Sequence, residues 1–246
     1  MGSDGALSRS AWYRGVTRVG IFDYGAGNLH SLVKAIEGGG RSVSVDTDIR
    51  ASVQADILIL PGVGAFGAAV AAMRGAQEYV RSALADGKPC VGVCLGMQML
   101  FDASEETPES DGGIGLIPGQ VKRLATPKVP HMGWNEIEWV EQGKGEEGRG
   151  KRERGNGEAG SGKWETGVPE STPSQSQISA AYFANAYVCW PEDSSIILAW
   201  TTHQSARFPS VVRTANTIGV QFHPEKSSAS GREFVSAMID ELLRCK

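Results

Sequence analysis

The sequence has few of the residues that mark metal centres, disulfide frameworks or membrane spans. Its 246 residues include four cysteines and four histidines, and these show neither the CxxC spacing nor the histidine pairs of a zinc site. No apolar run approaches the roughly 18 residues that a transmembrane helix needs. The first fifteen residues lack the apolar core of a secretory signal. We therefore expect no metal, no membrane association and reduced thiols in a cytoplasmic protein.

The chain also lacks an excess of basic residues. Lys and Arg number 24 against 28 Asp and Glu, which gives a net charge of −4. A protein that binds nucleic acid through its phosphates needs a basic face, so we expect no nucleic-acid partner. With 41% hydrophobic and 21% charged residues, the composition is typical of a globular protein with a substantial core.

Apolar, strand-like runs alternate with helical patterns along the first half of the chain. The strand-like runs lie at 18–22, 42–46, 55–60 and 88–93, and the helical patterns at 28–40, 66–87 and 94–104. This alternation is typical of an open, mostly parallel sheet with helices on both faces. It predicts an α/β fold.

The second half has a different pattern. Strand-like runs follow one another at short spacing at 180–190, 195–203, 211–217 and 217–225, and a last helical pattern covers 231–245. Short strands without intervening helices indicate antiparallel pairing. We therefore expect an added, mostly antiparallel β region beside the parallel sheet.

Two segments have compositions that oppose folding. Residues 1–16 are small and polar without periodicity, which predicts a disordered lead-in. Residues 141–178 are rich in Gly, Glu, Lys, Arg and Ser, with nearly balanced charges, and such a segment buries too little apolar surface to offset its ordering entropy. We expect a single domain over 17–246 that carries 141–178 as a low-complexity, disordered insertion. A regulatory or partner-binding role for this insertion is the alternative interpretation.

A G-x-C-x-G motif at 92–96 lies between a strand-like run and a helical pattern. It has the form of a nucleophile elbow, in which a tight turn presents the nucleophile. A position at a helix N-terminus favours the thiolate of Cys94, and the backbone N–H of Leu95 is placed to stabilise an oxyanion. The alternative is that Cys94 is a buried apolar cysteine, as we expect for Cys90 and Cys189.

A candidate base lies near the end of the chain. A cysteine nucleophile requires a base, and the base an orienting group. His223 and Glu225 are two residues apart, and in an extended segment such residues point to the same face. The carboxylate is then able to fix the orientation of the imidazole. A surface histidine beside a surface glutamate is the alternative, whereas His131, in a proline-rich turn, suits contacts better than base catalysis.

The turn Pro61-Gly62-Val63-Gly64 follows another apolar run. Glycine-rich turns after strands expose backbone N–H groups, which here would face a carbonyl oxygen. The Walker lysine and the G-x-G-x-x-G pattern of phosphate-binding turns are missing. The turn is therefore a candidate for substrate binding rather than phosphate binding.

Together these motifs resemble the class I (triad) glutamine amidotransferases, which combine G-x-C-x-G-x-Q with a downstream H-P-E. The chain has GVCLGMQ at 92–98 and HPE at 223–225. Further stretches are similar to the glutaminase subunits of imidazole glycerol phosphate synthase: DYGAGNL at 23–29, PGVGAFGAA at 61–69, PHMGWN at 130–135 and QFHPEKSS at 221–228. The resemblance covers about residues 18–140 and 180–243. It implies a class I amidotransferase fold with a flavodoxin-like core and no cofactor.

The resemblance also implies roles for individual residues. It makes Cys94, His223 and Glu225 the catalytic triad. It assigns oxyanion and substrate binding to Gly62, Val63, Gly64, Leu95 and Gln98, with a peptide flip in the 61–64 turn as a step that precedes oxyanion binding. It places Asn28, Trp134 and Lys226 at or near a subunit interface and its ammonia gate.

The implied activity is hydrolysis of L-glutamine to glutamate, with ammonia channelled to a separate (β/α)₈-barrel cyclase subunit in a heterodimer. The cyclase forms imidazole glycerol phosphate and aminoimidazole carboxamide ribotide in histidine biosynthesis. The chain departs from the family's Y-F-x-H-S-Y pattern at Asn185 and Ala186. Two other interpretations stay open: a stand-alone cysteine amidohydrolase, and a catalytically silent binding subunit.

Overall fold

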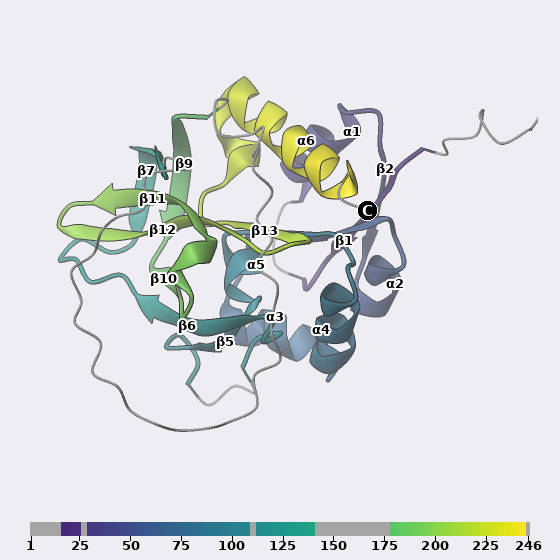
Figure 1. Cartoon of the computed structure of the whole chain (residues 1–246), viewed down its shortest axis with the longest axis horizontal. Helices are drawn as coiled ribbons and strands as arrows, with labels where there is room; N and C mark the ends of the chain where they lie inside the picture. Colours follow the sequence, from purple (N-terminus) through teal and green to yellow (C-terminus); the bar gives the residue numbers. More distant parts are fainter. Residues whose placement is uncertain (1–15, 26–28, 109–111, 141–177, 245–246) are drawn as a thin grey trace, which may run out of the picture.

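The computed structural model describes residues 16–25, 29–108, 112–140 and 178–244 (Figure 1). The strands are β1 (Arg18–Phe22), β2 (Ser42–Asp46), β3 (Ile57–Leu60), β4 (Cys90–Val93), β5 (Phe101–Ser104), β6 (Ile117–Arg123), β7 (His131–Glu136), β8 (Glu138–Trp139), β9 (Ala180–Asn185), β10 (Tyr187–Pro191), β11 (Ile197–His203), β12 (Ala206–Arg213) and β13 (Thr217–Val220). The helices are α1 (His30–Glu37), α2 (Ile49–Val53), α3 (Phe66–Ala72), α4 (Gln77–Ala85), α5 (Leu95–Gln98) and α6 (Ser228–Arg244), with 3-10 turns at Ser194–Ile196 and Pro224–Lys226.

An eight-stranded sheet forms the centre of the molecule, in the order β2-β1-β3-β4-β13-β12-β11-β8. The strands from β2 to β13 pair in parallel, whereas β12, β11 and β8 continue the sheet in antiparallel fashion. Every residue of β3, β4 and β13 is buried, because helices cover both faces of a parallel sheet. The predicted α/β fold with an added antiparallel region is confirmed.

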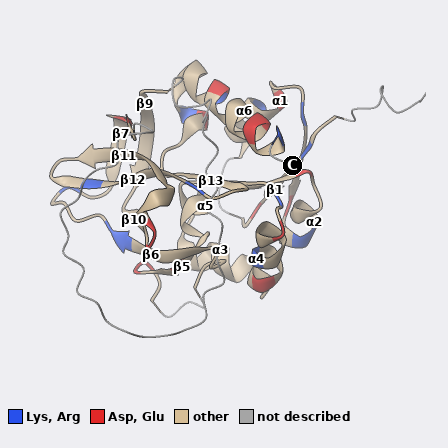
Figure 2. Ribbon diagram, in the orientation of Figure 1, with Lys and Arg blue, Asp and Glu red and all other residues tan. Residues whose placement is uncertain are grey.

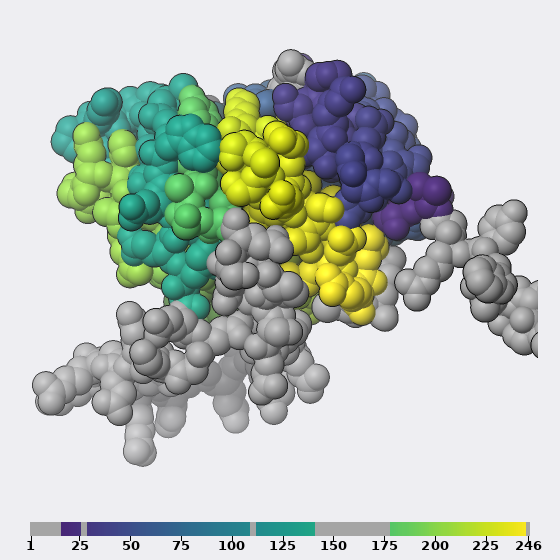
Figure 3. Space-filling view, turned by 90° about the horizontal axis from the view of Figure 1, so that it is seen from above, coloured from purple at the N-terminus to yellow at the C-terminus, as the bar shows by residue number. Residues whose placement is uncertain are grey.

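Two helical layers enclose the sheet. Helices α1 and α6 cover one face, and α2, α3 and α4 lie on the other (Figure 1). Each layer has its own apolar core, one built around Ile36 and Phe234 and the other around Phe66 and Leu84. Viewed from above, α6 lies between the N-terminal part of the chain and the antiparallel strands (Figure 3).

Two smaller sheets complete the β region. Strands β10, β6 and β5 form one, and the antiparallel pair β7 and β9 forms the other. Burial alternates along β9, and β7 begins with a buried residue and then exposes part of its length. This one-sided packing leaves Met132 61% and Trp134 56% exposed on β7. The β7–β9 pair therefore presents a partly apolar surface to its surroundings.

Three predicted elements differ from the structure. The helical pattern at 66–87 forms two helices, separated where Arg74 and Gly75 adopt positive φ. The pattern at 94–104 forms a single helical turn, after which Phe101 is fully buried in β5 and pairs with Ile117. The run at 180–190 divides between two sheets. The break in the first pattern is local, whereas in the other two cases strand pairing decides what the local pattern left open.

The predicted disordered segments lie almost entirely outside the described residues. The exceptions are Val16 at the end of one segment and Ile178 at the end of the other. Ile178 is buried, and its carbonyl oxygen accepts a hydrogen bond from Trp139 Nε1 at 2.9 Å, so the ordered domain resumes at this residue. Among the described helices, none combines the length and apolar character needed to cross a bilayer.

Candidate active site

Cys94 occupies the turn between β4 and α5, at the carboxyl end of the parallel sheet. Its backbone has φ 47° and ψ −105°, a conformation that L-residues rarely adopt and that is typical of a nucleophile elbow. The Cys94 N–H donates to Val220 O at 2.6 Å, and the Cys94 carbonyl accepts from Gln98 N at 3.1 Å. Pairing on both sides thus fixes the turn that carries the thiol.

The glycines of the motif are required by close approach of other backbone. A Cβ at Gly96 would lie 1.9 Å from Leu60 O, and one at Gly92 would lie 2.7 Å from Gly96 O. Both distances are shorter than a carbon atom permits. Only glycine lets α5 begin directly against β3, so the elbow geometry follows from the sequence itself.

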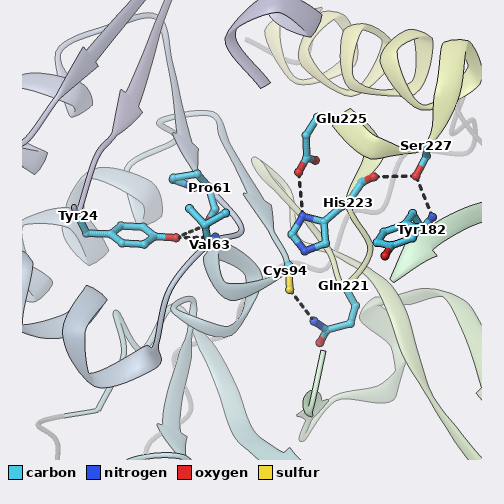
Figure 4. Close-up of polar contacts among 9 residues, drawn as sticks. All are labelled: Tyr24, Pro61, Val63, Cys94, Tyr182, Gln221, His223, Glu225 and Ser227. Carbon is cyan, nitrogen blue, oxygen red and sulfur yellow. Dashed lines mark hydrogen bonds and ion pairs between the residues drawn. The ribbon is translucent and has the colours of Figure 1, made fainter. Parts of the chain in front are cut away.

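His223 and Glu225 contact each other as predicted, by a different local geometry. His223 Nδ1 lies 2.8 Å from Glu225 Oε1 (Figure 4). The two residues do not lie in an extended segment, because the strand β13 ends at Val220 and Pro224 begins a 3-10 turn. The turn directs the carboxylate back to the imidazole, and both side chains are at least nine-tenths buried.

The surroundings of His223 favour its protonated form. Burial lowers the pKa of His223, but the charge and hydrogen bond of Cys94, together with those of Glu225, raise it to about 10. For the buried thiols of Cys90 and Cys189 the neutral form is favoured instead, because burial raises the pKa of each thiol well above its ordinary value. Cys94 is thus the described cysteine that faces a cationic partner, whereas the other two pack as apolar residues.

The Pro61–Gly64 turn lies directly against Cys94 and His223. A Cβ at Gly62 would lie 3.0 Å from Cys94 Cβ and 3.0 Å from His223 Cε1. The Val63 N–H donates to the Tyr24 hydroxyl at 3.3 Å. Sequence reasoning placed this turn at the site, but it did not anticipate that a tyrosine side chain engages the Val63 amide.

Gln98 lies one helical turn beyond Cys94 and is buried. Its Nε2 donates to the Tyr187 carbonyl at 3.2 Å, and the Nδ2 of Asn185 donates to the same oxygen at 3.1 Å. Asn185 is one of the two residues that depart from the family pattern, the other being Ala186. Its amide shares an acceptor with Gln98, so the departure lies beside a predicted substrate-binding residue.

Two of the predicted interface residues, Trp134 and Lys226, are exposed, unlike the buried side chains of the triad. Trp134 lies on β7 with its ring edge-on to Tyr182, and Lys226 is exposed in the 3-10 turn after His223. Asn28 lies outside the described residues. His131, which we expected in a turn, is the first residue of strand β7. Its ring is buried and stacks on Phe183 at a centroid distance of 4.8 Å.

Three further residues at the site were missed by sequence reasoning. Gln221 Nε2 lies 3.5 Å from Cys94 Sγ. Ser227 Oγ accepts from Tyr182 N at 2.9 Å and donates to His223 O at 2.7 Å, and Tyr24 contacts the 61–64 turn (Figure 4). Gln221 precedes His223 by two residues, so the same-face argument applied to Glu225 would also have placed Gln221 beside His223. Tyr24 and Ser227 have no such local signal.

The described part of the chain shows neither a cluster of metal ligands nor a block of charge of one sign. Among the residues that the structure describes, no three His, Cys, Asp or Glu side chains gather as metal ligands. Basic and acidic residues are interspersed over the ribbon (Figure 2). The site combines a cysteine at an elbow, an imidazole held by a carboxylate and a glycine-rich turn that lies against both. These groups are the ones that acyl transfer from an amide requires.

Comparison with known proteins gives the same assignment. The glutamine amidotransferase class-I family matches residues 20–240. The chain is 34% identical to the imidazole glycerol phosphate synthase subunit HisH of Gloeothece citriformis, covering 91% of this chain and 96% of the relative. It is 36% identical to the same subunit of Geobacillus thermodenitrificans, covering 91% and 96%.

The fold is also similar to a solved structure of a glutamine amidotransferase. The TM-score is 0.62 at 18% sequence identity, covering 89% of this chain and 98% of that one. At this identity the likeness concerns the fold. The family match covers most of the chain, and the sequence identity to the two curated relatives is 34% and 36%. The chain therefore belongs to the class-I glutamine amidotransferase family and, within it, to the HisH subunits of imidazole glycerol phosphate synthase.

Proposed function

We propose that this chain hydrolyses L-glutamine to glutamate with Cys94, His223 and Glu225 as its catalytic residues. The observation that carries the proposal is the geometry of the triad, in which Cys94 lies at a strained elbow beside a histidine whose Nδ1 is 2.8 Å from Glu225 Oε1. The raised pKa of His223, about 10, indicates an imidazolium next to the sulfur of Cys94. This pair combines an active nucleophile with a proton donor at neutral pH.

In the first half of the reaction the Cys94 thiolate attacks the side-chain carbonyl carbon of glutamine. The tetrahedral intermediate collapses when the carbon–nitrogen bond breaks and His223 donates its proton to the departing ammonia. The product is a γ-glutamyl thioester on Cys94. The Leu95 N–H, at the start of α5, would stabilise the oxyanion together with backbone amides of Gly62, Val63 and Gly64.

In the second half the neutral His223 removes a proton from water as the water attacks the thioester. Glutamate leaves, and the thiolate and imidazolium are restored. Glu225 holds the imidazole by Nδ1, which leaves Nε2 for the transferred proton. Gln98 is proposed to contact the bound glutamine from the helical turn behind Cys94.

We further propose that the ammonia passes to a separate (β/α)₈-barrel cyclase subunit. The curated relatives are named as subunits of imidazole glycerol phosphate synthase, and the partly apolar surface around Trp134 lies beside Tyr182. We assign Asn28, Trp134 and Lys226 to this interface. In the complex, ammonia and a phosphorylated ribulosyl aminoimidazole carboxamide give imidazole glycerol phosphate and aminoimidazole carboxamide ribotide, in the cytoplasm, where free thiols persist.

The test measures glutamate release by the purified chain alone and with the cyclase subunit loaded with the ribulosyl intermediate. We expect strong stimulation by the loaded partner. Cys94→Ala is expected to lower glutamine-dependent synthesis by at least roughly 10³-fold while ammonia-dependent synthesis by the complex persists. Cys90→Ala, four residues earlier and fully buried, is the matched control and is expected to retain activity.

The same assay separates the other interpretations. Full turnover by the isolated chain, unchanged by the cyclase, would indicate a stand-alone amidohydrolase. Complex formation without glutamate release would indicate a binding subunit, with Asn185 and Ala186 as the first residues to restore to the family pattern. Glutamine-dependent activity in Cys94→Ala would show that the nucleophile is assigned wrongly.

A further inference from the structure

The side-chain amide of Gln221 contacts the sulfur of Cys94 from a fully buried position. Gln221 directly follows strand β13 and is 0% exposed, and its Nε2 donates a hydrogen bond to Cys94 Sγ at 3.5 Å. Its backbone N donates to Ser210 O on strand β12 at 2.9 Å. Cys94 N donates at 2.6 Å to the carbonyl oxygen of Val220, the residue before Gln221. Sheet pairing therefore places this amide at the nucleophile.

The carbonyl end of the same amide has no hydrogen-bond partner among the residues that the structure describes. Gln221 Oε1 is buried and accepts no hydrogen bond from them. A buried carbonyl without a partner costs free energy, and an apolar side chain of similar size would avoid that cost. Packing alone thus gives no reason for a glutamine at this position, whereas the contact of its Nε2 with Cys94 Sγ does.

Cys94 Sγ has two donors of different kinds. The His223 imidazole and the Gln221 amide approach the sulfur from different sides (Figure 4). His223 gives up its proton during the proposed reaction, whereas a carboxamide neither gains nor loses one near neutral pH. The amide is therefore a donor that remains on the sulfur in every protonation state of the imidazole.

We propose that Gln221 is a further catalytic residue, whose side-chain N–H stabilises the Cys94 thiolate before it attacks the substrate. The inference rests on the proposed function, which assigns Cys94 as the nucleophile. Loss of the donor makes the thiolate scarcer and also more reactive, because the nucleophilicity of a thiolate rises with its basicity. With a Brønsted coefficient of about 0.4–0.5, a tenfold loss of thiolate is offset by an about threefold gain in the reactivity of each thiolate.

The titratable groups that face Cys94 within the described chain are the same in the wild type and in a Gln221 variant. They are His223 with Glu225 behind it, Tyr24 and Cys189. Burial, with a smaller contribution from Cys94, raises the pKa of Tyr24 and of Cys189 well above their ordinary values, so both stay neutral. A difference in the pH response of Cys94 between the two proteins therefore reports the amide.

The test follows alkylation of Cys94 by iodoacetamide from pH 4 to pH 10, read by mass spectrometry of the peptide that contains this residue. A carbon–sulfur bond forms and iodide leaves, so the rate reports the thiolate without glutamine or a partner. Gln221→Met removes the donor and keeps the length of the side chain. We expect the midpoint of the profile to move up by about one pH unit. The rate should be about threefold lower below both midpoints and about threefold higher above them.

A second readout is kcat/KM for glutamate release by the complex with the loaded cyclase. Its profile reports the substrate-free enzyme, so its acid limb is expected to move up by about one pH unit in Gln221→Met, as the alkylation midpoint does. The urea midpoint of unfolding is expected to equal or exceed that of the wild type, because the substitution removes a buried carbonyl without a partner. Gln221→Leu repeats these measurements with an apolar side chain of different shape.

Gln54→Met is the matched control. The Nε2 of Gln54 also donates one hydrogen bond, to the Tyr79 hydroxyl at 2.9 Å. Gln54 precedes β3, whereas Cys94 follows β4, and because these strands are parallel the two residues lie at opposite edges of the sheet. We expect this variant to keep the wild-type alkylation and kcat/KM profiles.

The outcomes separate a role at the sulfur from a structural one. An alkylation midpoint that stays in place in folded Gln221→Met and Gln221→Leu overturns the inference, even if the rate falls at every pH. A moved midpoint with an unmoved acid limb of kcat/KM overturns the catalytic role. A wild type without glutaminase activity, alone and with the cyclase, instead refutes the proposed function, while the alkylation profiles still decide whether Gln221 stabilises the thiolate.

Discussion

Two histidines in different regions of the molecule are almost equally buried and have opposite properties. His223, which follows the carboxyl end of the parallel strand β13, is 2% exposed. His131, in the antiparallel β7–β9 pair, is 3% exposed. The pKa of His223 is raised to about 10, whereas that of His131 is lowered to about 4. Burial by itself lowers the pKa of both. What differs is the set of groups around each ring.

His131 is surrounded by rings and by a second histidine. Its ring stacks on those of Phe183 and His203, with centroid distances of 4.8 Å and 4.1 Å. Burial is the larger cause that lowers the pKa of His131, and the charge of the neighbouring His203 is the smaller one. His223 instead contacts Cys94 and Glu225, whose negative charges outweigh the same burial. Anionic partners, rather than depth in the core, therefore distinguish the histidine that we propose as the proton donor from one that packs.

The largest expected effect comes from making His223 more like His131. Glu225→Gln keeps the shape of the side chain but removes one of the two charges that raise the pKa of His223, the other being that of Cys94. We expect glutamine-dependent turnover to fall by roughly 10²-fold. Because His223 must be protonated to release ammonia, the alkaline limit of turnover, near pH 10 in the wild type, shifts to lower pH.

The measurement is kcat/KM for glutamate release across pH 6–11 by the complex with the loaded cyclase, because its pH profile reports the pKa values of the substrate-free enzyme. Glu138→Gln, an exposed carboxylate that pairs with Arg207 on the antiparallel strands, is the control and is expected to keep the wild-type profile. An unchanged alkaline limit in Glu225→Gln would show that Glu225 does not set the pKa of His223.

A smaller effect is expected on the exposed side of β7, the strand that begins with His131. Trp134→Ala removes an apolar ring that is 56% exposed and that we assign to the cyclase interface. We expect affinity for the cyclase subunit to fall about tenfold, in the range of a moderate interface residue, with unchanged basal glutaminase activity. Titration calorimetry measures this, with Trp190→Ala on β10 as the control; equal affinities would remove Trp134 from the interface.

The smallest expected effect is a pH dependence of the free energy of unfolding, which arises because His131 is neutral in the folded protein. The folded-state pKa is below that of the unfolded chain, so the unfolded state binds more protons as the pH falls below about 6.5. The free energy of unfolding is therefore expected to decline between pH 6.5 and pH 4. His131→Phe, which retains a stacked ring, should reduce that decline by about 2 kcal/mol between pH 7 and 5 in urea unfolding. An identical decline in both proteins would contradict the role of His131.

The sequence by itself determined the parallel sheet and the elbow that carries the proposed nucleophile, and it identified the candidate base. Continuous apolar runs at β3 and β4 require burial on both faces, and the glycines around Cys94 allow the elbow to form against the preceding strand. These are local constraints, set by side chains within a few residues of one another. For the same reason the spacing of His223 and Glu225 was informative even though the backbone between them is a 3-10 turn.

Tertiary structure alone decided which distant groups meet at that nucleophile. The Tyr24 hydroxyl reaches a turn 37 residues further along the chain, and Gln221 reaches Cys94 across 127 residues. The pKa values of His223 and His131 diverge because folding brings a thiol and a carboxylate to one ring and aromatic rings to the other. Such contacts depend on strand order and packing, which no local pattern encodes.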